Sequence, residues 1–131
     1  MEQTTKTFDR ERSEQFGEKL LGIINGGPLS LMISIGHRTG LFDVLGRIDS
    51  ADAPAIAEKS GLNERYVKEW LGAMVTGGII EYNGMLRTYA LPEEHKAWLT
   101  REAGADNMAV FSQYTSVLGT VEDAIIDCFH N

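Results

Sequence analysis

The middle of the chain contains two short helical patterns separated by a glycine and followed by a strong hairpin signal. Asp52 or Ala53 is placed to cap the first helix and Asn63 the second, because a cap must accept hydrogen bonds from backbone N–H groups of the first turn. Gly61 between them permits a tight turn, and Gly77 marks the expected end of the second helix. Two helices in such close succession predict a helix-turn-helix.

A β-hairpin is predicted directly after this unit. The stretches IIEY (79–82) and LRTYAL (86–91) have strand character and are joined through Asn83-Gly84. Asn-Gly is a strong hairpin signal because both residues readily adopt the positive φ of a two-residue turn. Helix, turn, helix and hairpin in this order predict a winged helix-turn-helix with its wing at 79–91.

A helical pattern precedes this unit and predicts an N-terminal arm over residues 1–27. Its apolar side carries Phe16, Leu20 and Ile23. We expect this helix to end at the glycine pair before Pro28, because glycine favours a helix C-terminus and proline suits the first turn of a new helix. The second helix, LSLMISIGHRTG, is apolar on nearly all sides and is therefore predicted to be buried.

The C-terminal stretch, residues 106–131, predicts one long helix. Its apolar residues recur every seven positions in two series, Phe111, Leu118 and Ile125, and Tyr114, Val121 and Cys128. An apolar face of this size at the end of a small domain predicts packing on a partner, with the arm joining it in the interface. The predicted fold is mostly α, with a winged-helix body at 28–100 and long dimerisation helices at both ends.

Charge argues against DNA as the partner. The chain has 12 basic and 19 acidic side chains, a net charge of −7, and residues 50–92 alone have four basic and five acidic ones. A DNA-binding module usually neutralises on the order of 6–10 phosphates. A transcriptional regulator therefore stays the alternative function, with Arg65, Lys68 and Arg87 as its candidate DNA contacts.

The residues predict no catalytic, cofactor-binding or metal site. His37, His95 and His130 are scattered without the spacing of metal ligands, and the single cysteine, Cys128, excludes an internal disulfide. His37 is explained more simply as a partnered core histidine or as a cation near a helix C-terminus than as a catalytic base. The two glycine pairs lack the strand–loop–helix context of a phosphate-binding loop.

Four residues are candidates for lining an apolar substrate pocket: Met32, His37, Met108 and Tyr114. Core or interface packing is the simpler explanation for most of them. Tyr114 is the most informative, because its hydroxyl needs a hydrogen-bond partner wherever it is buried.

The N-terminus predicts a cytoplasmic protein. It is polar and lacks the apolar segment of a signal peptide. The longest nearly unbroken apolar run, 29–35, is far shorter than the roughly 18 residues of a membrane span. We therefore expect no membrane partner.

Four stretches resemble the N-terminal part of a family of bacterial two-domain S-adenosylmethionine (SAM)-dependent methyltransferases. They are LSLMISIGHRTGLFDVL, IAEKSGLNERYVKEWLGAMVTGGIIEY, YALPEEHKAWLT and NMAVFSQYTSVLGTVEDAIIDCF. The resemblance implies a winged-helix domain that mediates homodimerisation and forms a lid over the substrate site. It also implies that a separate class I methyltransferase domain holds SAM.

The glycine-rich loop that such a catalytic domain requires is absent from these 131 residues. We therefore do not assign methyl transfer to this chain alone. Two interpretations stay open: the chain is part of a longer protein whose catalytic domain begins after Asn131, which we prefer, or it is a free-standing relative that keeps only the interaction module.

Overall fold

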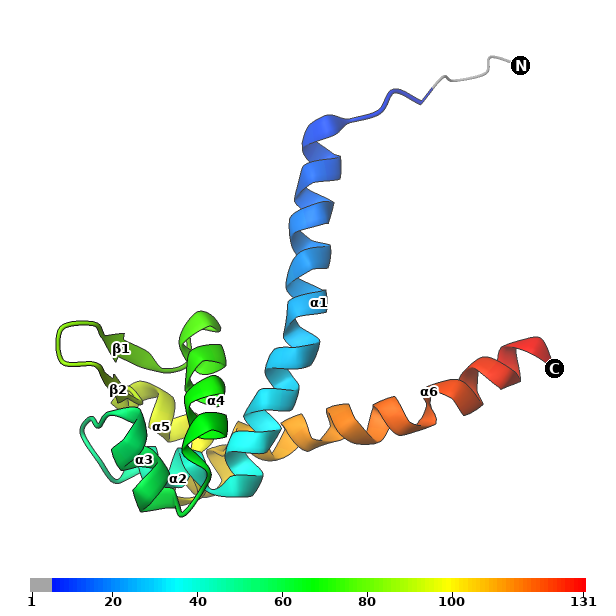
Figure 1. Ribbon diagram of the computed structural model, residues 1–131. Helices are drawn as coiled ribbons and strands as arrows, with labels where there is room; N and C mark the ends of the chain where they lie inside the picture. The colour runs from blue at the N-terminus through cyan, green and yellow to red at the C-terminus, as the bar shows by residue number, and fades with distance from the viewer. Residues whose placement is uncertain (1–5) are drawn as a thin grey trace, which may run out of the picture.

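The structure, a computed structural model that describes residues 6–131, is mostly helical with one small sheet (Figure 1). Its elements are α1 (Arg10–Thr39), α2 (Leu41–Gly46), α3 (Ala53–Ser60), α4 (Glu64–Thr76), β1 (Glu81–Asn83), β2 (Thr88–Ala90), α5 (Glu93–Leu99), the 3-10 helices η1 (Arg101–Asp106) and η2 (Met108–Gln113), and α6 (Tyr114–His130). Helices α2 to α5 and the sheet form a body, from which α1 and α6 project in different directions.

The helix-turn-helix is confirmed as α3 and α4. Asp52 caps α3, since its carboxylate accepts a hydrogen bond from the backbone N–H of Ala55 at 3.0 Å. Asn63 caps α4 by accepting from the N–H of Arg65 at 3.0 Å. Gly61 ends α3 at a φ of 70°, in the left-handed region that glycine enters without strain. Of the two candidate caps for this helix, Asp52 and Ala53, Asp52 is therefore the one that caps it.

The wing is confirmed as the antiparallel pair β1 and β2, but its predicted two-residue turn is wrong. Asn83 is the last residue of β1, and four residues, 84–87, connect it to β2. The Asn83 side chain accepts hydrogen bonds from the N–H groups of Met85 and Leu86 at 3.0 and 3.1 Å, which stabilises a wider loop. Arg87 takes the positive φ, 54°, in this loop.

The predicted break at the glycine pair before Pro28 is also wrong. Helix α1 runs through it for 30 residues. Proline has a φ close to that of a helix and removes only one backbone donor, and glycine permits the left-handed conformation without requiring it. The prediction that this stretch is buried is only partly correct, because Leu31 and Ile35 remain exposed while Ser34, Gly36 and His37 are buried.

The single predicted helix over 106–131 is divided in the structure. Gly104 interrupts η1 with a φ of 63°, and η2 lies between η1 and α6. The buried Asn107 begins η2, where its side chain accepts from the N–H of Ala109 at 3.0 Å. Helix α6 has no buried residue, and after its first turn, where Thr115 meets α1, its residues are exposed.

The core forms where α1, α2 and α4 meet. Its fully buried side chains include Phe42, Leu45, Ile56, Leu71 and Met74. The Trp70 ring meets Phe42 edge to face with centroids 5.2 Å apart, and its Nε1 donates to the carbonyl of Met32 in α1 at 2.8 Å. Tyr66, which directly precedes the buried Val67 in α4, is 74% exposed and lies outside the core.

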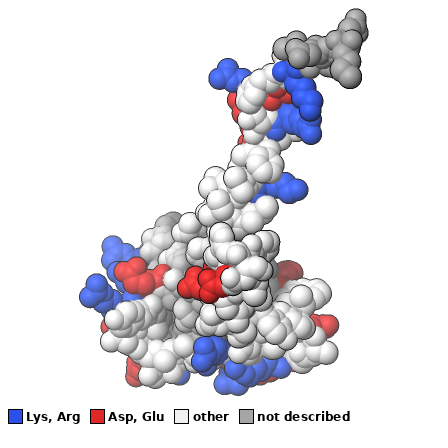
Figure 2. All heavy atoms as spheres, turned by 90° about the vertical axis from the view of Figure 1, so that its right-hand side faces the viewer, with Lys and Arg blue, Asp and Glu red and all other residues white. Residues whose placement is uncertain are grey.

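Helix α1 is the one helix of the described residues that has the length and composition to cross a membrane. The longest apolar run in the sequence did not indicate such a helix, because glycines and serines interrupt the apolar residues of α1 without making the helix polar. Its C-terminal third packs on the body, and its first turns carry charged side chains (Figure 2).

Gly36 is required by the close approach of α1 to the core. A Cβ at this position would lie 2.5 Å from Cζ2 of Trp70 and 2.6 Å from Cε2 of Phe42. We expect Gly36→Ala to lower the free energy of unfolding by about 1–3 kcal/mol, as overpacking does. Urea denaturation of both proteins measures this.

Gly72→Ala in α4 is the matched control. A Cβ there meets no atom within 4 Å, so alanine should raise the free energy of unfolding by up to about 1 kcal/mol through helix propensity. Equal effects of the two substitutions would contradict the close approach at Gly36.

Candidate functional site

The largest unusual feature of the surface is the exposed apolar side of α1 and α6, which project from the body (Figure 1). On α1 we define the arm face as Phe16, Leu20, Leu21, Ile23 and Ile24, which are 41–63% exposed. On α6 we define the α6 face as Val117, Leu118, Val121, Ile125, Ile126 and Phe129, which are 41–84% exposed. Figure 2 shows the projecting part of α1, with charges concentrated at its outer end and few charges along the rest.

The direction of α6 is set by contacts at its first turn. The hydroxyl groups of Ser30 in α1 and Thr115 in α6 lie 2.9 Å apart and share a hydrogen bond. Phe111 at the end of η2 stacks on Tyr114, with ring centroids 6.4 Å apart. Helix α1 also packs along η2, so α6 leaves the body from a fixed point.

The seven residues predicted to form a dimer interface are all exposed in this chain: Phe16, Leu20, Ile23, Phe111, Leu118, Val121 and Ile125. Six lie on the two faces, and Phe111 lies on η2 beside the start of α6. Five further members of the two faces were not among the predicted interface residues: Leu21, Ile24, Val117, Ile126 and Phe129. Their pairing with a partner stays a prediction.

The four candidates for a substrate pocket do not meet in one cavity of the described structure. Met108 and Tyr114 are 52% and 61% exposed on the C-terminal segment, while His37 is buried in α1. Only Met32 lines a substantial groove.

That groove lies between α1 and α4 and has a volume of about 840 Å³. Leu29 and Met32 line its α1 side, and the small residues Gly72, Ala73 and Gly77 line its α4 side. The glycine at position 77 is required, because a Cβ there would lie 2.5 Å from Cδ1 of Leu29. The sequence signal for this groove was the small-residue face of α4, which periodicity of apolar residues does not reveal.

His37 is buried, 9% exposed, and its Nδ1 has no hydrogen-bond partner. Burial lowers the pKa of this imidazole, the positive charge of Arg101 lowers it further, and Asp43 opposes them. His37 is therefore a core histidine, as expected, but its Nδ1 lacks the expected partner, and burial favours the neutral ring over a cation.

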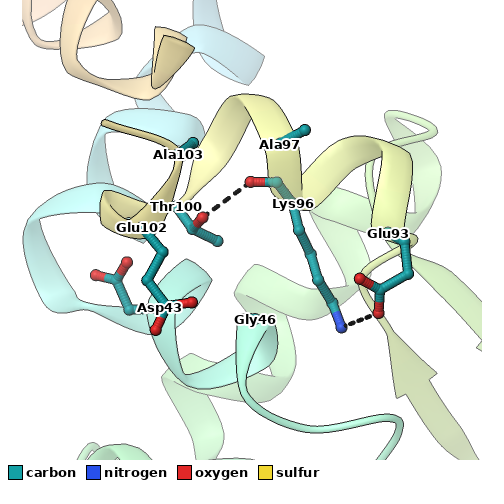
Figure 3. Close-up of a pocket in the computed structure, with 8 residues that line it drawn as sticks. All are labelled: Asp43, Gly46, Glu93, Lys96, Ala97, Thr100, Glu102 and Ala103. Carbon is teal, nitrogen blue, oxygen red and sulfur yellow. Dashed lines mark hydrogen bonds and ion pairs between the residues drawn. The ribbon is translucent and has the colours of Figure 1, made fainter. Parts of the chain in front are cut away.

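A second, smaller pocket lies between α2, α5 and η1 (Figure 3). Lys96 reaches across its edge, where its Nζ donates to the Glu93 carboxylate at 2.6 Å and to the carbonyl of Ile48 at 3.3 Å. Asp43 accepts hydrogen bonds from the backbone and the guanidinium of Arg101. These groups connect the elements to one another, so the pocket is explained by packing of the domain.

The two tyrosines of the wing lie opposite each other in the sheet, with ring centroids 4.8 Å apart. Burial raises the pKa of Tyr89, and the neighbouring Tyr82 raises it further. Tyr89 also exchanges two backbone hydrogen bonds with Ala51, at 2.8 and 3.1 Å. Tyr89 therefore attaches the wing to the body and stays uncharged at neutral pH.

The three candidate DNA contacts are exposed, but acidic groups accompany them. Lys68 of α4 and Arg87 of the wing line one shallow pocket together with Asp52 and Glu64. Arg65 lies at the start of α4 beside the same Glu64. The face that a winged helix would present to DNA therefore has mixed charge. Within residues 6–131, no group of three His, Cys, Asp or Glu side chains is placed to hold a metal ion.

Residues 27–101 match the sequence model of the Rv2258c-like winged HTH domain. The chain belongs to this family. No curated protein sequence matches it.

Three solved methyltransferase structures resemble the fold of this family member. PigF with SAH has a TM-score of 0.65 and 18% identity, covering 92% of this chain and 34% of PigF. Mitomycin 7-O-methyltransferase MmcR has a TM-score of 0.58 and 19% identity, covering 68% of this chain and 26% of MmcR. Human N-acetylserotonin methyltransferase in complex with SAM has a TM-score of 0.53 and 20% identity, covering 74% and 28%.

The chain thus spans about a quarter to a third of each of these proteins. Its winged helix-turn-helix resembles a domain of SAM-dependent methyltransferases, which confirms the predicted fold class and family resemblance.

We expect this winged HTH domain not to bind DNA, because its exposed face has mixed charge. Fluorescence anisotropy with a labelled duplex at low salt measures this, and the protein should leave the signal unchanged up to about 100 µM, the weak end of non-specific affinities.

A variant with Glu64→Lys and Glu69→Lys is the matched control, since it replaces two negative charges of α4 with two positive ones and so raises the net charge of this helix by four. It should bind weakly and lose affinity as salt rises. Salt-dependent binding of the unaltered protein, weakened by Lys68→Ala and Arg87→Ala, would instead support a regulator.

Proposed function

We propose that this chain is the dimerisation and substrate-lid domain of a SAM-dependent methyltransferase and acts in a homodimer. The observation that carries the proposal is the pair of unpartnered apolar faces on α1 and α6, on a winged helix whose fold occurs in methyltransferases. We expect the enzyme in the cytoplasm, as the polar N-terminus indicates.

The exposed faces favour a second copy of this chain as the partner. Together they present eleven large apolar side chains on two helices that leave the body. Soluble monomers rarely expose contiguous apolar patches larger than a few hundred Å². Burial of such surface contributes roughly 25 cal/mol per Å² before ordering costs, and a stable interface buries about 800 Å² on each partner.

A dimer with twofold symmetry would cover the exposed apolar faces of both helices. In a symmetric dimer the same patch occurs on both copies, so the arm face of one copy is able to cover the α6 face of the other. Charges favour this arrangement over a nucleic acid, because α6 carries Glu122, Asp123 and Asp127 and its only basic group is the terminal His130.

The methyl donor belongs elsewhere in such an enzyme. SAM-binding domains hold the donor at the end of a parallel sheet beside a glycine-rich loop. The sheet in residues 6–131 is a two-stranded antiparallel wing, which does not fit this group. We therefore propose that the donor binds a separate catalytic domain, while this domain supplies dimer contacts and one wall of the substrate site.

Leu118→Asp tests the interface. Leu118 is 64% exposed in the single chain but lies in the middle of the α6 face, so a buried carboxylate there should disrupt a dimer. We expect light scattering coupled to gel filtration to give the dimer mass for the unaltered protein and the monomer mass, or insoluble protein, for the variant.

Met85→Asp is the control for this experiment. Met85 is 96% exposed at the tip of the wing, outside both faces, so its variant should remain a dimer. A Leu118→Asp protein that stays a soluble dimer would reject the α6 face as the interface. A protein that needs detergent to remain in solution would point to α1 as a membrane helix instead.

Calorimetry tests the division of labour. Titration of this chain with SAM should give no heat of binding, because no element of it fits the donor. The circular dichroism spectrum of the same sample must show folded helix. Saturable binding of SAM by the folded chain would contradict the assignment of the donor to another domain.

A further inference from the structure

One face of α1 is polar where it enters the body. Ser30, Ser34 and His37 follow one another at helical spacing, and Ser34 and His37 are 3% and 9% exposed. The segment 101–115, which contains η1 and η2, approaches this face: Ser30 shares a hydrogen bond with Thr115, and η2 packs along α1. Helices α1 and α6 are thus joined across a polar contact.

Few groups compensate a charge at this contact. The charged groups that act on His37 are Asp43 in α2 and Arg101 in η1. Asp43 is already occupied by two hydrogen bonds from Arg101, and η2 has no titratable side chain. From α4, the residue that reaches this part of α1 is Trp70, which is uncharged and packs beside Gly36.

We propose that His37 is a proton-sensitive latch: the neutral ring allows segment 101–113 to pack on α1, and protonation releases that segment and the helix α6 that follows it. An imidazolium at this position adds a second positive charge near Arg101 in a site from which solvent is largely excluded. Asp43 opposes this cost but already pairs with Arg101, so it compensates the new charge only in part, and opening the contact hydrates the imidazolium.

The sign of the pH dependence follows from the lowered pKa of His37 in the closed state. The opened segment leaves the ring hydrated, with a pKa near its usual 6.5. The closed state is therefore fully favoured above pH 6.5 and loses stability as pH falls below it. At pH 5.5, one unit below that value, the opening equilibrium increases by up to about tenfold.

Hydrogen exchange of the unaltered protein at pH 7.5 and 5.5 measures the opening, with rates corrected for intrinsic exchange. The protection of peptides covering 101–113, including the buried amide of Ala109, should fall by up to about tenfold. Peptides covering α4 should keep their protection, because the helix-turn-helix core does not open.

Two substitutions assign the effect to His37. In His37→Leu and His37→Gln the protection of 101–113 should no longer depend on pH, since neither side chain titrates in this range. His130→Gln is the matched control, because His130 is exposed at the end of α6 and its loss should leave the pH dependence unchanged.

The latch is overturned if segment 101–113 keeps its protection at pH 5.5, or if it loses protection equally in the His37 variants. Should neither variant fold, the imidazole resonances of the unaltered protein decide: a ring that titrates at 6.5 or above contradicts the latch. These outcomes do not depend on the proposed dimer, because exchange in a monomer reports the same contact.

Discussion

The contact between α1 and the aromatic pair of the core is the constraint on which the rest of the structure depends. Phe42 and Trp70 approach α1 so closely at Gly36 that no side chain fits there. The indole Nε1 also donates to the Met32 carbonyl, so the position of Trp70 along α1 is fixed as well. Because this point is fixed, the remaining two thirds of a 30-residue helix must project beyond the body.

A helix held in this way contributes to several surfaces along its length. Around Gly36 it covers the core, at Ser30 it meets α6, along Leu29 and Met32 it forms a groove with α4, and before Pro28 its residues are exposed. These surfaces use different sides of the helix, and the contact at Ser30 is polar. Helix α1 therefore has no single dominant apolar side along its length.

The sequence alone was sufficient to predict the elements that depend on hydrogen bonds and backbone angles of neighbouring residues. Asp52, Gly61 and Asn63 determine the helix-turn-helix through hydrogen bonds and a positive φ that involve only neighbouring residues. It failed where local signals permit a break without requiring it, as at Pro28, or where a competing local hydrogen bond forms, as at Asn83. The exposed faces were largely predictable from apolar spacing, whereas the unpartnered nitrogen of His37 depends on which elements fold over it and has no sequence signal.

The distribution of charged and apolar residues over the surface favours a protein partner over DNA. A winged helix that binds DNA needs a basic α4 and wing, but here Glu64 and Asp52 accompany Lys68 and Arg87. The exposed apolar surface lies instead on α1 and α6, the two helices that project from the body and away from the charged residues of the helix-turn-helix. In the dimer that we propose, this fold keeps its body as a scaffold and presents its recognition surface on α1 and α6. The contact between α1 and segment 101–113 would then set the angle between the two surfaces that a second copy must match.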